Sequence, residues 1–227
     1  MKKFLSLIIL ISVFSLYTYI NENNKVPDTL SATNITMENI PAYADKAYIE
    51  INNNEPSFNS LTTESFELYG DLDDLGRCTV AYASLGKDLM PTEKRTGIGM
   101  IKPSGWHTVK YDIVDGKYLY NRCHLIGFQL TGQNANKNNL ITCTRQTNSQ
   151  TMLEFENKVA DYIKETNNHV MYRVTPIFEN DNLLASGIHM EALSVEDNGD
   201  GLKFNVYVYN VQDGIEINYL NGDSKLK

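Results

Sequence analysis

Alternating apolar and polar positions in the first two thirds of the chain predict several short strands. Residues 47–51 alternate and end at three consecutive asparagines, and residues 77–82 show a similar pattern. Residues 106–112 and 117–120 flank an Asp-Gly pair, which is typical of a tight hairpin turn. Residues 139–143 form one more apolar stretch. We therefore expect five short strands here, two of them joined as a hairpin.

One long helix is predicted over residues 149–166, and two asparagines at 167–168 supply its stop signal. The apolar residues that follow helical spacing are Met152, Phe155, Val159 and Ile163. Three longer strands are predicted after the helix, over residues 169–177, 183–193 and 202–211. This order of elements predicts an α+β fold with an antiparallel β-sheet core and one prominent helix.

The N-terminus has the pattern of an export signal. Lys2 and Lys3 precede an apolar run over residues 4–20, which is near the lower length limit for crossing a bilayer. No Ala-x-Ala cleavage site follows, so the sequence slightly favours an uncleaved membrane anchor over a released signal peptide. A buried N-terminal helix fits the charged start less well. We assign residues 1–20 to the signal or anchor, 21–39 to a polar linker and 40–227 to the folded domain.

Composition and charge narrow the class of protein. The chain has 227 residues, and its apolar content of 42% is sufficient for one domain with a sizeable core. The net charge of −8 alone argues against a nucleic-acid partner. The charges are unevenly distributed, however, because residues 86–148 contain nine Lys or Arg against four Asp or Glu. A basic middle in an acidic chain is compatible with phosphate binding.

Three cysteines exclude a fully paired intramolecular set. No pair has the spacing of a zinc finger, which argues against a structural zinc site. Cys123 and Cys143 could form a disulfide in an exported protein, and unpaired packing is an equal alternative.

The candidate chemistry is concentrated around His124. Asn139 and Asn148 follow it, and Glu156 lies about two turns into the predicted helix. Phosphodiester hydrolysis needs a base that works near neutral pH and positive charge against the developing phosphorane, which histidine and a hard divalent cation can supply. Mg²⁺ prefers oxygen ligands and keeps several waters, so one amide oxygen can hold it. Arg122 could grip two phosphate oxygens.

Each of these residues also has a structural interpretation. A histidine after a strand is more often structural than catalytic, Asn148 could cap the helix, and Glu156 could be a solvated helix residue. A nucleophilic Cys123–His124 pair is geometrically poor, because adjacent residues of an extended chain point to opposite faces. From the residues alone, a metal-dependent nuclease is one option among several hydrolases.

The segment Asn121-Arg122-Cys123-His124 resembles the Asp-Arg-Gly-His motif of the DNA/RNA non-specific endonucleases, which have the ββα-metal fold. Within that family the chain is most similar to secreted streptococcal DNases and to membrane-anchored DNA-entry nucleases. The resemblance covers residues 40–220 in several ordered blocks. These blocks are residues 89–95, 102–106, 124–132, 139–142 and 169–178.

The resemblance implies a role for each matching residue. His124 matches the general base that activates water, and Asn148 matches the direct protein ligand of a single Mg²⁺, with Mn²⁺ as an alternative ion. Asn139 matches an asparagine that shapes the site, and Glu156 matches an acid that orients metal-bound water. Arg122 matches the motif arginine, and we add Arg95 as a candidate phosphate contact. The implied products carry 5′-phosphates.

Two departures from the motif leave two functional hypotheses. Asn121 stands where Asp is usual and Cys123 where Gly is usual, yet the base and the metal ligand are both retained. The first hypothesis is a metal-dependent endonuclease of DNA, and also of RNA. The second is a surface DNA-binding module for uptake or adhesion that has lost catalysis. The N-terminal segment adds the membrane as a partner, and no protein partner is inferred.

Overall fold

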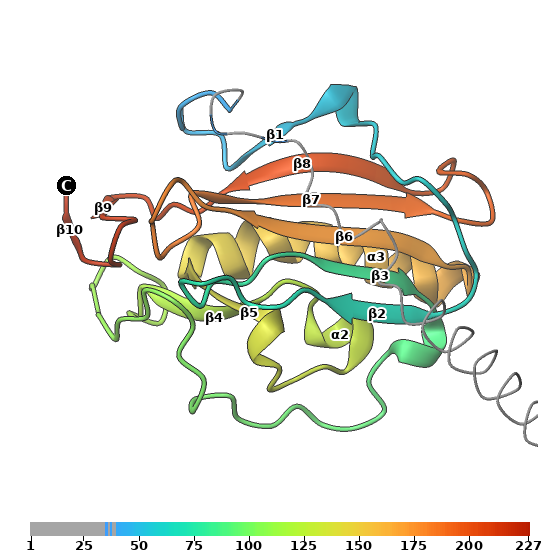
Figure 1. The fold of residues 1–227 in the computed structure, drawn as a ribbon, viewed down its shortest axis with the longest axis horizontal. Coiled ribbons are helices and arrows are strands. Elements are labelled where there is room, and N and C mark those ends of the chain that lie inside the picture. Colours follow the sequence, from blue (N-terminus) through green and yellow to red (C-terminus); the bar gives the residue numbers. More distant parts are fainter. Residues whose placement is uncertain (1–34, 36, 38–39) are drawn as a thin grey trace, which may run out of the picture. The chain divides into compact units, whose positions relative to one another are not determined.

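A six-stranded antiparallel sheet forms the centre of the domain (Figure 1). Its strands lie in the order β1-β8-β7-β6-β3-β2. This computed structural model describes residues 35, 37 and 40–227 of the chain. The strands are β1 (Tyr48–Glu50), β2 (Phe66–Tyr69), β3 (Ala81–Leu85), β6 (Val170–Ile177), β7 (Gly187–Ser194) and β8 (Lys203–Tyr209).

The sheet confirms the predicted antiparallel core and corrects the start of two strands. β7 begins at Gly187 instead of residue 183. β3 begins at Ala81 instead of residue 77, because Arg77 belongs to a turn. Its backbone N–H and its Nε both donate to the Asp73 carboxylate, at 2.9 and 2.7 Å. β2 was not predicted, and it adds an edge strand that pairs only with β3.

Helix α3 (Leu153–Thr166) packs one face on the sheet, as its apolar spacing predicts. The helix is continuous with a π-helical turn, Thr147–Met152, and helical backbone begins at Arg145. It ends at Asn167, whose left-handed backbone (φ 59°) lets its N–H reach the carbonyl of Ile163. The buried face of α3 joins the main core through Phe155, Val159, Ala160 and Ile163.

A separate two-stranded ladder carries the candidate histidine. β4 (Tyr120–His124) pairs antiparallel with β5 (Leu140–Thr144), and His124 lies opposite Leu140. A disulfide joins Cys123 to Cys143 across this ladder, with Cα atoms 5.9 Å apart. The short helix α2 (Phe128–Thr131) follows β4 (Figure 1). Ladder, connecting loop and α3 together give the ββα arrangement that the resemblance implies.

The hairpin predicted over residues 106–120 forms only next to its turn. The N–H of Lys117 donates to the Val114 carbonyl at 2.8 Å across the Asp-Gly pair, and a single bridge, Lys110 to Tyr118, pairs the two segments. Tyr120 belongs to β4, which pairs with β5. The apolar residues of this stretch pack against the C-terminal hairpin of β9 (Ile215–Ile217) and β10 (Ser224–Leu226). The buried members of this second core are Val114, Leu119, Tyr120, Leu184 and Ile215.

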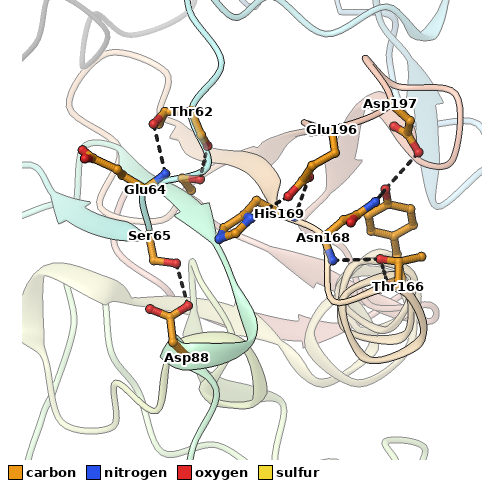
Figure 2. Close-up of polar contacts among 11 residues, drawn as sticks. Thr62, Glu64, Ser65, Asp88, Thr166, Asn168, His169, Glu196 and Asp197 are labelled. Carbon is orange, nitrogen blue, oxygen red and sulfur yellow. Dashed lines mark hydrogen bonds and ion pairs between the residues drawn. The ribbon is translucent and has the colours of Figure 1, made fainter.

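Several polar contacts lie near the C-terminal end of α3 (Figure 2). Glu196 accepts hydrogen bonds from the backbone N–H of His169 at 2.8 Å and from its ring Nδ1 at 2.7 Å. Ser65 donates to Asp88 at 2.6 Å. These contacts tie the residue before β6 to the turn after β7, and the residue before β2 to the Lys87–Leu89 turn.

The predicted export segment and most of the predicted linker lie outside the described residues. Within the described part of the chain, no helix has both the length and the hydropathy that a bilayer span needs.

Candidate active site

A cavity of about 430 Å³ lies where β4 ends and the long helix begins. Four of the residues singled out in the sequence line it: Arg95, His124, Asn148 and Glu156. The cavity is also lined by Gly127, Phe128, Gln129, Arg145, Ser149 and Leu153. The fold therefore brings together side chains that are separated by up to 61 positions in the sequence.

His124 is held so that one ring nitrogen is left as a base. Its Nε2 lies 2.9 Å from the backbone carbonyl oxygen of Asn134. A carbonyl only accepts, so Nε2 carries the proton and Nδ1 keeps the free electron pair. Burial lowers the pKa of His124 below its ordinary value, the Asn134 hydrogen bond opposes this, and the Arg95 charge lowers it further. The ring is therefore neutral, and able to accept a proton, at pH 7.

Asn148 lies within the π-helical turn, and its amide makes no hydrogen bond to any residue that the structure describes. Asn148 is not the helix cap, because Thr144 fills that role by accepting a hydrogen bond from the backbone N–H of Thr147 at 3.0 Å. Single π-turns inside longer helices are frequent at functional sites. The unengaged amide oxygen of Asn148 is therefore available to a ligand in the cavity.

Glu156 is an acid held in a poorly hydrated place. Burial raises its pKa to about 8, although a Gln129 hydrogen bond and the Arg95 charge both act in the opposite direction. Gly127 is what allows this placement, because a Cβ on Gly127 would lie 2.5 Å from Glu156 Oε2. These contacts contradict the alternative of a solvated surface residue, and a cation in the cavity would favour the carboxylate form.

Asn139 lies beside the cavity and does not line it. Its side chain is fully buried and forms two bonds with the backbone of Ile126: Oδ1 accepts from the N–H at 2.9 Å, and Nδ2 donates to the carbonyl at 3.0 Å. Its own carbonyl accepts from Leu125 N–H at 2.9 Å. Asn139 therefore fixes the path of the chain directly after His124.

Arg122 also acts at a distance from the cavity. Its Nη2 donates to the carbonyl of Gly99 at 2.8 Å, and its Nε donates to the carbonyl of Ile101. Its guanidinium stacks on the Trp106 ring, 3.9 Å from the centroid. Arg122 therefore holds the loop that follows Arg95 and is absent from the cavity wall.

The sequence and the fold of this chain are similar to those of known nucleases. The sequence profile of the DNA/RNA non-specific endonuclease family matches residues 57–196. The chain belongs to this family. The match confirms the resemblance seen around His124, and members of this family are endonucleases whose substrates are nucleic acids.

Solved structures agree with the family assignment. NucA from Streptococcus agalactiae with magnesium ion bound has a TM-score of 0.72 at 23% identity, covering 84% of this chain and 93% of that one. Sda1 nuclease with bound zinc ion has a TM-score of 0.61 at 29% identity, covering 71% and 81%. A protein described as an extracellular endonuclease has a TM-score of 0.59 at 20% identity, covering 82% and 100%.

The residues of this endonuclease fit an oxygen-preferring cation. Asn148 offers a neutral amide oxygen without a partner among the described residues, and Glu156 is a half-buried acid that lines the same cavity. Among the described residues, no three His, Cys, Asp or Glu side chains form a group that could hold a metal ion. The cavity therefore suits an ion held by few protein ligands together with water and substrate oxygens.

Arg145 is the cavity residue that the sequence reasoning missed. Its Nη2 lies 2.9 Å from the Asp115 carboxylate, which holds a second guanidinium at the cavity besides that of Arg95. Arg145 lies three positions before Asn148, so helical spacing from the metal-ligand candidate could have identified it.

Proposed function

We propose that this endonuclease hydrolyses phosphodiester bonds in DNA and RNA without sequence preference, with His124 as the general base and one Mg²⁺ as cofactor. The observation that supports it best is the hydrogen bond from His124 Nε2 to the Asn134 carbonyl. This bond leaves Nδ1 unprotonated in a residue that lines the same cavity as Asn148 and Glu156.

Asn148 would hold the metal ion directly, and Glu156 would bind and orient the water around it. When bound, the ion supplies positive charge that stabilises the phosphorane and the leaving oxygen. Mg²⁺ or Mn²⁺ suits this site better than zinc, because the available donors are oxygens.

The two cavity arginines would hold the substrate phosphate. Arg95 influences the pKa of both His124 and Glu156, so its guanidinium stands close to the reacting groups. Arg145 is oriented by Asp115 and lines the same cavity as Arg95. A guanidinium can donate two parallel hydrogen bonds to a phosphate, which fixes its orientation.

His124 would take the proton from the attacking water at Nδ1 as the water oxygen bonds to phosphorus. The bond from phosphorus to the 3′ oxygen then breaks, and the leaving oxygen takes a proton from a solvent water, which gives a 3′-hydroxyl and a 5′-phosphate. The hydrogen bond to Asn134 stabilises the imidazolium that forms. This route uses the neutral histidine that the lowered pKa maintains.

A covalently closed plasmid tests this proposal, because a circle has no ends and only an endonuclease can open it. We expect the purified protein to nick and linearise the plasmid with Mg²⁺ and to stop when EDTA is added. His124→Ala should lose at least a hundredfold in rate, since general base catalysis contributes about 10²–10⁴-fold. His107→Ala is the matched control, because His107 is half-exposed and lines no part of this cavity. Equal rates in the two variants would refute the role of His124.

The alternative is a DNA-binding module without catalysis, and the substitutions Asn121 and Cys123 motivate it. A gel shift with DNA, together with intact plasmid under every divalent metal tested, would favour this alternative and defeat the nuclease mechanism.

We also propose that the protein acts outside the cell, exported by its N-terminal segment and either released or held at the membrane. The Cys123–Cys143 disulfide supports export, because disulfides persist in oxidising compartments. Nuclease activity in the medium would indicate release, activity on washed cells would indicate anchoring, and activity only inside lysed cells would contradict export.

A further inference from the structure

A second cavity adjoins the candidate active site and shares one side chain with it. Its volume is about 460 Å³, and Phe128 belongs to the walls of both cavities. The remaining apolar wall comes from Leu89, Met90 and Pro91. Asp88 also lines this cavity, and its carboxylate accepts a hydrogen bond from Ser65 (Figure 2). Most of the wall comes from two of the sequence blocks that carry the family resemblance, residues 89–95 and 124–132.

We propose that this second cavity binds the nucleobase next to the scissile phosphate, with Phe128 as the stacking surface. The proposal rests on the proposed nuclease function. In a nucleic-acid strand, each base is one sugar away from the phosphate, so a cavity that shares a wall with the phosphate site is where a base would lie. Aromatic side chains bind bases by stacking regardless of base identity.

The charges of the second cavity favour a base over a phosphate. Asp88 and Glu93 stand against a single ammonium group, that of Lys94. A phosphate would meet net negative charge here, whereas a neutral base would not. The arginines Arg95 and Arg145 lie in the first cavity, where the phosphate belongs. The two cavities thus divide the charged and uncharged parts of a nucleotide between them.

Two polar side chains of this cavity, Asn134 and Thr131, have partners within the protein, while the buried Oδ1 of Asn134 has none among the described residues. The Asn134 amide donates to the Thr96 carbonyl at 3.0 Å and to its hydroxyl at 2.5 Å. The Thr131 hydroxyl lies 3.4 Å from the Tyr69 hydroxyl. Asn134 also connects the cavities, because its backbone carbonyl holds His124.

The test compares two oligonucleotides of equal length, one of thymidines and one with tetrahydrofuran residues in place of every nucleoside. Both carry the same phosphates, so the ratio of their kcat/KM values isolates the contribution of the bases. We expect the wild-type protein to favour the thymidine strand by about 5- to 150-fold, the range that base–aromatic stacking supplies. Phe128→Leu should bring the ratio close to one, and Phe128→Trp should restore it.

Two further variants serve as controls for the role of Phe128. Thr92→Trp places an indole in the second cavity from an exposed loop residue, and it should lower the ratio even if Phe128→Leu fails to fold. Tyr118→Leu removes an exposed ring that lines neither cavity and should leave the ratio unchanged. An equal loss on both strands in Phe128→Leu, or a base preference that survives it, would overturn the proposal.

Binding separates this proposal from the nuclease function. Fluorescence anisotropy gives the Kd of both strands for His124→Ala, alone and combined with Phe128→Leu. We expect Phe128→Leu to weaken only the binding of the thymidine strand, by the same 5- to 150-fold range expected for cleavage. If the wild-type protein cleaves neither strand, the proposed function fails, and this Kd comparison still decides whether the cavity binds a base.

Discussion

Asn139 offers a sharp test of how the active site is held together. Its side-chain amide is bonded on both sides to the backbone of Ile126, and both residues are fully buried. Asn139→Ala would leave the N–H and the carbonyl of Ile126 without partners in a place that water does not reach. A buried polar group that loses its partner costs about 1–3 kcal/mol, so the two together should lower the free energy of unfolding by about 2–6 kcal/mol.

Urea unfolding measures this loss as a lower midpoint with an unchanged slope. Asn138→Ala is the matched control, because the buried Oδ1 of Asn138 has no hydrogen-bond partner among the described residues. We expect that control to change stability by less than about 1 kcal/mol. Asn139→Asp adds a second measurement: the ionised carboxylate can accept from Ile126 N–H but cannot donate to the carbonyl, so this variant should regain stability as acid protonates the introduced group.

The reasoning is refuted if Asn139→Ala and Asn138→Ala cost the same. It is also refuted if Asn139→Ala keeps full stability and loses only cleavage, because Asn139 would then act on the substrate. In our assignment, Asn139 positions the chain after His124, so activity and stability should fall together.

Three other perturbations follow from the same site. Replacing Cys123 and Cys143 by alanine should lower the free energy of unfolding by about 3 kcal/mol, since the bond closes a loop with a sequence separation of 20; a denaturation midpoint that reduction of the wild-type protein does not shift would contradict this. Burial lowers the pKa of His124, so the midpoint of the acid limb of kcat/KM against pH should lie below the ordinary histidine value of about 6.5, and a midpoint above it would contradict the burial argument. Gly127→Ala should reduce cleavage by tenfold or more, because its Cβ would displace the Glu156 carboxylate; an unchanged rate with intact folding would show that Glu156 has no part in the reaction.

Much of the fold could be predicted from local patterns, and the failures have a common cause. The helix and the strands β6, β7 and β8 show periodicity over many residues, so local sequence was sufficient. The stretch 106–120 alternates in the same way, yet its apolar side chains bury against β9, which lies about a hundred residues later. A period-2 pattern reports that one face is buried and does not report which segment covers it.

The site shows the same limit for individual residues. His124, Asn148 and Glu156 come together in one cavity, while Arg122 and Asn139 bond to backbone groups beside it. A motif identifies the types and the order of residues. A side chain that lines the cavity and one that bonds to the backbone beside it satisfy the motif equally. Which polar side chain reaches the cavity depends on backbone carbonyls, such as those of Gly99 and Ile126, whose positions no sequence pattern records.

The two departures from the family motif lie on the face of β4 that points away from the reaction. Side chains alternate along a strand, so Asn121 and Cys123 share the face opposite to His124. Cys123 confirms this, because it is fully buried in the main core and bonded to Cys143, whereas His124 lines the cavity. The substitutions were the reason to consider a protein with lost catalysis. Their position instead explains how a disulfide could replace a glycine next to the proposed base and leave the base in place.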